Sequence, residues 1–151
     1  MTRKLASYFT DYAEYHSTSG NVACHYLGIP MIVVSLIGLA SMVTFGNSSF
    51  EAGLIRPDLG FVLVLMGMGF YLYLDWKIAI SFFIVLMGCY FISRALPLPV
   101  LIGLQVVGWP IQYLGHLHYE KNSPAFYKNL THTLIGPLWI FAKAIGYTKA
   151  E

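Results

Sequence analysis

The sequence predicts an all-α protein, an integral membrane helical bundle with about four transmembrane helices and an interfacial helix near each end of the chain. Of the 151 residues, 57% are hydrophobic and only 11% are charged, whereas charged residues make up about a quarter of a soluble domain. Four long runs contain no charged residue: residues 15–50, 59–74, 78–93 and 95–119. A core of this size cannot bury so much apolar length, so we expect a single membrane-embedded domain over residues 1–151.

The first segment of the chain is amphipathic. Apolar side chains recur there at spacings of three and four, at Leu5, Tyr8, Phe9, Tyr12 and Tyr15. This periodicity predicts a helix over residues 3–16 that lies at the membrane surface. The small and polar residues 17–20 end it. A second helix, the first span, is expected over residues 21–45, with Pro30 either kinking it or marking its entry into the membrane.

The centre of the chain predicts a tight helical hairpin. After a polar loop over residues 46–58, two apolar runs of 16 residues, 59–74 and 78–93, are separated by only three residues. Each run reaches about 24 Å as a helix, somewhat less than a hydrocarbon core of about 30 Å. Residues 100–114 supply a fourth span. Residues 134–147 are apolar but brief, so we expect an interfacial helix there.

The basic residues are distributed unequally between the two sides of this predicted bundle. Four crossings place the N-terminus, the turn at 75–77 and the C-terminal segment on one side. Seven of the nine basic residues fall on that side, and only Arg56 and Arg94 fall on the other. The positive-inside rule therefore predicts that the first side is cytoplasmic. No basic run suggests a nucleic-acid partner.

All five histidines fall near the predicted cytoplasmic ends of the spans. His16 and His25 are nine residues apart, which would place them on opposite faces of one unbroken helix. The break at residues 17–20 allows His16 to end one helix while His25 faces it from the next. His116 and Glu120, at i and i+4, share a helix face.

Imidazole and carboxylate groups together favour a divalent transition metal, with iron(II) and zinc as the candidates. His132 could complete the ligand set. His118 lies about 200° around a helix from His116 and is not expected to join it. The alternative interpretation is that each histidine is only a polar anchor at the interface and that Glu120 is a solvated helix end.

Two motifs carry a resemblance to a known family. They are Tyr12-x3-His16-x4-Asn21-x3-His25-x2-Gly28-Ile29-Pro30 and Gln112-x2-Gly115-His116-x3-Glu120-Lys121-x2-Pro124-Ala125. Together they resemble the 2-hydroxy fatty acid dioxygenase family over nearly the whole chain. The resemblance implies an iron(II)-dependent membrane enzyme of fatty acid α-oxidation, which uses dioxygen to shorten a 2-hydroxy fatty acid by one carbon. It would act in a bacterial inner membrane or, in a eukaryote, at the endoplasmic reticulum.

The resemblance also implies roles for individual residues. The family's histidines correspond to His16, His25 and His116, and a looser match extends the metal-ligand set to His132, with Glu120 beside them as a catalytic group. Tyr12, Asn21, Gln112 and Glu120 are then expected to orient the imidazoles. Lys121 and Lys128 could steer the substrate carboxylate to the metal while the acyl chain lies among the apolar spans.

Three other classes compete with this interpretation. In a zinc-dependent membrane hydrolase the same imidazoles would activate water; metal analysis and dependence on dioxygen separate the two. A diiron desaturase or hydroxylase uses many more histidines than the five of this chain. A non-catalytic membrane protein, such as a transporter subunit or haem carrier, would place ionisable residues inside its spans, and the predicted central hairpin has none.

Overall fold

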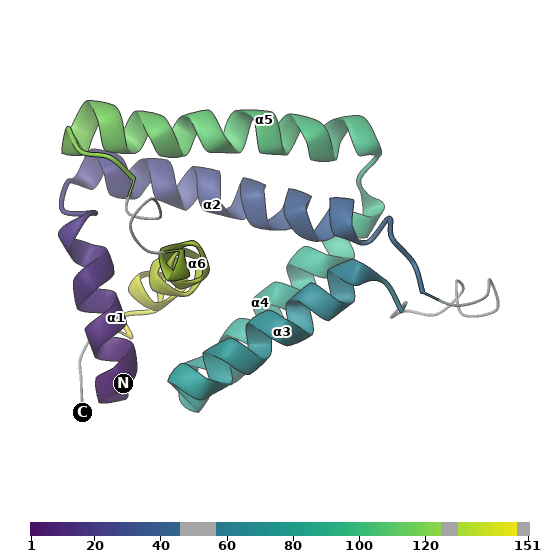
Figure 1. Cartoon of the computed structure of the whole chain (residues 1–151), viewed down its shortest axis with the longest axis horizontal. Coiled ribbons are helices and arrows are strands. Elements are labelled where there is room, and N and C mark those ends of the chain that lie inside the picture. The colour runs from purple at the N-terminus through teal and green to yellow at the C-terminus, as the bar shows by residue number, and fades with distance from the viewer. Residues whose placement is uncertain (46–56, 125–129, 148–151) are drawn as a thin grey trace.

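The computed structural model describes residues 1–45, 57–124 and 130–147, and the regular elements in this part of the chain are helices. Figure 1 shows their arrangement. The elements are α1 (Arg3–Glu14), α2 (Ser19–Ala40), α3 (Leu59–Leu74), α4 (Trp76–Ala95), α5 (Leu98–Leu114), the π-helix η2 (Gly115–Glu120) and α6 (Thr131–Ala144). The all-α prediction is confirmed. The expected loop over residues 46–58 lies mostly outside the described residues.

Within the described residues, three helices are long and apolar enough to cross a membrane. They are α2 with 22 residues, α4 with 20, and the continuous helix formed by α5 and η2 with 23. α3 is equally apolar but has only 16 residues. Large apolar side chains such as Leu36, Met66, Ile84 and Val106 point outwards. A helix that is apolar on all sides is typical of a membrane span, so the predicted membrane bundle is supported.

α2 and α5 run antiparallel, side by side, along one edge of the molecule (Figure 1). Their backbones approach closely where two glycines face each other. A Cβ atom on Gly28 would lie 2.9 Å from the carbonyl oxygen of Gly108, and one on Gly108 would lie 2.8 Å from Ile32. Small residues at such a crossing let membrane helices pack tightly.

The predicted central hairpin is present, with a shorter turn than expected. α3 and α4 are joined by Asp75 alone, and this carboxylate caps α4 by accepting from the backbone N–H of Lys77 at 3.1 Å. Asp75 also accepts from the N–H of Thr2 at 2.7 Å and from the hydroxyl of Tyr147 at 3.1 Å. The N-terminus, the hairpin turn and the end of the described C-terminal segment therefore meet at one end of the bundle, as predicted.

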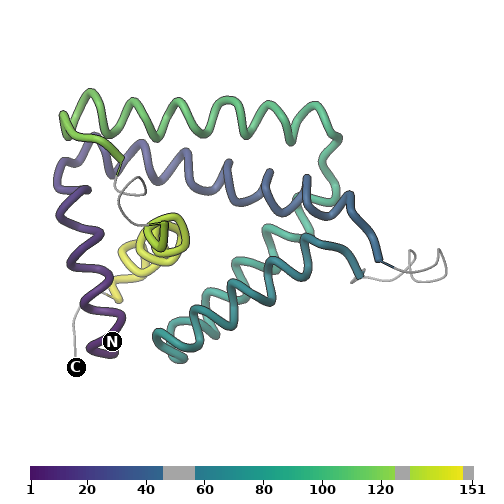
Figure 2. Tube along the Cα trace, in the orientation of Figure 1, coloured from purple at the N-terminus to yellow at the C-terminus, as the bar shows by residue number. Residues whose placement is uncertain are grey.

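α1 and α6 close the end of the bundle at which α2 begins. Figure 2 shows α1 running away from the point where α2 begins, and α6 packs against α1, α2 and α4 of the hairpin. α1 buries Leu5, Phe9 and Tyr12, which confirms the predicted amphipathic face. At 14 residues, α6 is too short to cross a membrane, as expected. A Cβ atom on Gly136 would lie 2.9 Å from the Tyr12 hydroxyl, so α6 lies directly against α1.

Candidate metal centre

The connection between α1 and α2 places the first histidine. α1 ends at Glu14 and α2 begins at Ser19, with Thr18 as its N-cap. In a capping box, a Glu or Gln three residues after the N-cap accepts a hydrogen bond from the N-cap backbone. Asn21 occupies that position here, and Glu120 of η2 supplies the carboxylate instead, accepting from the Thr18 N–H at 2.7 Å. His16 lies in this connection and is 4% exposed.

Glu120 holds the whole connection against η2. Besides the Thr18 backbone, its carboxylate accepts from the hydroxyls of Ser17 at 2.9 Å and Thr18 at 3.0 Å, and from the side-chain amide of Asn21 at 3.2 Å. All four donors come from a segment about 100 residues away in the sequence. The structure thus places Glu120 beside the histidines, bound to the segment that carries His16.

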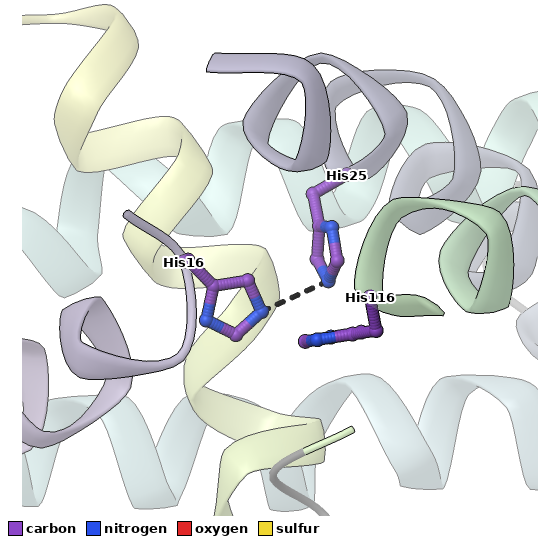
Figure 3. A group of neighbouring side chains, drawn as sticks. All are labelled: His16, His25 and His116. Carbon is purple, nitrogen blue, oxygen red and sulfur yellow. Dashed lines mark hydrogen bonds between the residues drawn. The ribbon is translucent and has the colours of Figure 1, made fainter. Parts of the chain in front are cut away.

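Three histidines converge in the interior and form the three-histidine group: His16, His25 and His116 (Figure 3). Their candidate ligand atoms all lie within 4.8 Å of one another. His25 and His116 are each 3% exposed. His25 comes from the second turn of α2 and His116 from η2, so three separate segments contribute. Of the histidines predicted to share a site, these three are brought together.

The hydrogen bonds of the group determine where its protons lie. His16 Nδ1 is 2.6 Å from the carbonyl oxygen of Tyr12, and His25 Nδ1 is 2.9 Å from that of Asn21. A carbonyl can only accept, so each Nδ1 carries the hydrogen and each neutral ring has its lone pair on Nε2. The two Nε2 atoms face each other at 3.0 Å (Figure 3).

Two lone pairs at this distance repel each other unless a cation lies between them. A proton is a poor candidate because burial, and secondarily the neighbouring His25, lowers the pKa of His16 to about 3. A metal ion fits: two nitrogen ligands with bonds of about 2.0–2.1 Å lie roughly 3.0–3.4 Å apart. The three-histidine group therefore has the donor chemistry of a transition-metal site.

η2 was not anticipated from the sequence, which predicted an α-helical face shared by His116 and Glu120. Its turns close between residues five apart, so residues four apart no longer lie one above the other. His116 turns into the site while Glu120 turns to the α1–α2 connection. Gly115 allows η2 to approach α2, since a Cβ atom there would lie 3.0 Å from Cys24. π-Helical turns are frequent at functional sites.

The residues predicted to orient the imidazoles surround the group. Tyr12 stacks its ring on His16, with centroids 3.9 Å apart. Tyr12 and Asn21 fix the rings through their main-chain carbonyls, each four residues before its histidine. Gln112 lines the same interior space, and its Nε2 has no hydrogen-bond partner among the described residues.

The remaining candidates lie elsewhere. His132, at the start of α6, is outside the three-histidine group; its Nε2 is 2.7 Å from Asp11 Oδ2. Asp11 was not singled out from the sequence, and no local spacing could have shown it, since 121 residues separate the pair. His118 is exposed, and its ring contacts the ring of Tyr119. Lys121 is exposed at the end of η2, and Lys128 lies outside the described residues.

The three-histidine group opens into an apolar cavity of about 460 Å³. The cavity follows α2 from His25 to Ile37, which at 1.5 Å per residue is about 18 Å. Residues of α3 and α6 form its other walls, including Val64, Tyr71 and Gly136. Its volume is in the usual range for ligand sites, and its polar groups gather at the histidine end. The arrangement suits a long apolar ligand with a polar head.

These features define a class, a helical membrane protein with a buried three-imidazole centre at the end of an apolar cavity. The chain belongs to the Mpo1-like family, described as 2-hydroxy-palmitic acid dioxygenase Mpo1-like, which matches residues 2–148. This confirms the family indicated by the two sequence motifs. The family's name suggests dioxygenase activity on a 2-hydroxy fatty acid. No curated protein and no solved structure matches the chain.

Proposed function

We propose that the protein is an iron(II)-dependent dioxygenase that shortens 2-hydroxy fatty acids by one carbon. The observation that carries this proposal is the three-histidine group, in which the Nε2 lone pairs of His16 and His25 face each other at the head of an apolar cavity. The family to which the chain belongs supports the reaction class. Dioxygen, the 2-hydroxy acid and the surrounding lipid are the proposed partners.

The ligand set suits iron(II) because three imidazoles leave coordination positions free. Iron bound there would supply sites for the carboxylate and hydroxyl of the substrate and for dioxygen. The chain's own residues do the positioning: the carbonyls of Tyr12 and Asn21 hold two rings in the required tautomer. Such hydrogen bonds to ligating imidazoles typically change metal affinity or activity by about 10–100-fold.

The cavity suits the acyl chain. Its length of about 18 Å corresponds to about 14 carbons, because each methylene extends a chain by about 1.25 Å when carbon–carbon bonds of about 1.5 Å meet at tetrahedral angles. Each buried methylene contributes about 0.8 kcal/mol. The wall residues are apolar along this length, so a fatty acid is favoured over a short hydroxy acid. Lys121, exposed at the end of η2, is proposed to attract the carboxylate.

We further propose that the chain is integral to the membrane, with the three-histidine group on the cytoplasmic side. The group lies where α1 ends and α2 begins, and the opposite end of α1 contacts the hairpin turn at Asp75. The basic residues expected on that side outnumber those expected on the other by seven to two. Depending on the organism, the membrane would be the bacterial inner membrane or the endoplasmic reticulum.

The test is anaerobic purification in detergent followed by elemental analysis and a turnover assay. We expect about one iron per chain, dioxygen consumption that depends on a 2-hydroxy fatty acid, and a product one carbon shorter by mass spectrometry. Removal of metal by a chelator should abolish turnover, and iron(II) but not zinc should restore it. Stoichiometric zinc with activity in the absence of dioxygen would contradict the proposal and favour a hydrolase, since three imidazoles also suit catalytic zinc.

A further inference from the structure

Asp11 and His132 form a polar pair at the wall of the cavity, separate from the three-histidine group. His132 is 4% exposed and lines the cavity, whereas the side chain of Asp11 is 48% exposed. Their contact, 2.7 Å between Nε2 and Oδ2, thus links the interior to the surface. The ring of Tyr12 lies beside both histidines, 3.9 Å from that of His16 and 5.5 Å from that of His132.

The free nitrogen of His132 requires a partner. Asp11 accepts the Nε2 hydrogen, so in the neutral ring Nδ1 carries a lone pair. Nδ1 is buried and has no hydrogen-bond partner among the described residues. A buried polar atom left unpaired destabilises the folded protein, because it has lost its hydrogen bonds to water without replacement. A ligand that fills the cavity with its polar head at the histidine end can supply the missing hydrogen.

We propose that His132 Nδ1 accepts the proton of the 2-hydroxyl group of the substrate. Asp11 orients the imidazole ring and balances the positive charge that the ring gains. The proposal rests on the proposed function for the identity of the substrate. In the step, the hydroxyl O–H bond breaks, the Nδ1–H bond forms, and the electron pair stays on the substrate oxygen. Asp11 stabilises the resulting imidazolium through Nε2, as the carboxylate of an Asp–His pair does in hydrolases. The half-exposed carboxylate then gives the proton a route to solvent.

This role differs from metal ligation in what it predicts. A metal ligand at His132 would use Nδ1 to hold the ion, and its loss would remove metal. A proton acceptor leaves metal binding intact and affects only substrates that have a proton to give. The unsubstituted fatty acid of the same length lacks the 2-hydroxyl and is therefore the matched probe.

The experiment compares His132→Gln and Asp11→Asn with wild type in three measurements. These are iron content, anaerobic equilibrium binding of a 2-hydroxy fatty acid and of the unsubstituted acid, and turnover. We expect unchanged iron content, unchanged affinity for the unsubstituted acid, and a loss of about 10-fold or more in affinity for the 2-hydroxy acid with His132→Gln. Turnover should fall by about 10²–10⁴-fold, mostly in kcat. Asp11→Asn should show the same pattern more weakly, and Glu14→Gln on the same helix should match wild type.

Each other outcome overturns the proposal. Loss of iron with His132→Gln would make His132 a ligand. Equal loss of affinity for both acids would show that His132 only shapes the cavity. Wild-type turnover would show that His132 has no role in the reaction. Should His132→Gln fail to fold, Asp11→Asn decides, because Asp11 lies at the surface. Failure of the proposed function shows separately, as absence of iron or of dioxygen consumption in the wild type.

Discussion

Replacing Glu120 by alanine is expected to weaken metal binding without abolishing it. The carboxylate accepts four hydrogen bonds, at 2.7–3.2 Å, from Ser17, Thr18 and Asn21. These bonds hold the connection that carries His16 and complete the N-terminal cap of α2. Without them the connection has more freedom in the metal-free protein, and metal binding has to order it.

The magnitude follows from the cap. Loss of an N-cap interaction typically costs about 0.5–2 kcal/mol, and a carboxylate near a helix N-terminus contributes about 0.3–1 kcal/mol. Glu120 is only partly buried, so solvent screens its hydrogen bonds and we take about 1–2 kcal/mol in total. At 1.4 kcal/mol per factor of ten, the apparent metal affinity should fall by about 5–30-fold. Most of this loss should appear with Glu120→Gln as well, because the amide lacks the charge.

The assay is a competition titration of iron(II) against a chelator of known affinity, run anaerobically on each variant at matched expression. Glu14→Ala is the control, since it removes an exposed carboxylate from α1 at a comparable cost in net charge. Wild-type affinity in Glu120→Ala would refute the positioning role. Complete loss of metal with an intact fold would show that Glu120 is itself a ligand.

The other predictions concern the ligands, the cavity and the topology. His116→Ala should lose most bound iron and all turnover, whereas His118→Ala, which changes an exposed residue of η2, should keep both. Iron content and turnover are measured for each variant. A well-folded but inactive His118 variant would show that the site has been assigned to the wrong residues. Val64→Phe should shorten the preferred acyl chain. Val64 lines the cavity one helical turn from Gly60, which packs against Ile37 at the end of α2 away from His25, and about two displaced methylenes change selectivity roughly tenfold. Competition between chain lengths measures this, and an unchanged preference contradicts it. In a variant without native cysteines, a cysteine at Lys77 should be labelled from the cytoplasm and one at Arg94 from the opposite side; labelling of both from one side would rule out the proposed topology.

Much of the fold followed from local patterns in the sequence. Apolar runs without charge predicted α3 to the residue and α4 to within two residues at each end, because membrane spans depend mainly on composition and length. The apolar spacing of three and four predicted α1, and the small polar residues 17–20 predicted its end. The first span was expected to reach residue 45, but α2 ends at Ala40, since hydropathy marks a span more clearly than it marks where the helix stops.

Part of the candidate site could likewise be predicted from local patterns in the sequence. The spacing of His16 and His25 across a helix break, together with His116 in the second motif, indicated the residues that the structure brings within 4.8 Å. The i−4 carbonyls of Tyr12 and Asn21 are also local features. These relations depend on helix geometry over a few residues, which the sequence alone determines.

Only the tertiary structure decided which polar groups from distant segments of the chain are paired at the site. Glu120 bonds to a connection about 100 residues away, and His132 pairs with Asp11 across 121 residues. The π-helical turn of η2 separates His116 from Glu120, although an α-helix would have placed them on one face. Periodicity describes a single helix and carries no information about which helix packs against it. The sequence by itself therefore determined the class of protein and indicated His16, His25 and His116 as candidate ligands. The packing of α1, η2 and α6 decided which polar groups surround them and left His132 outside the group.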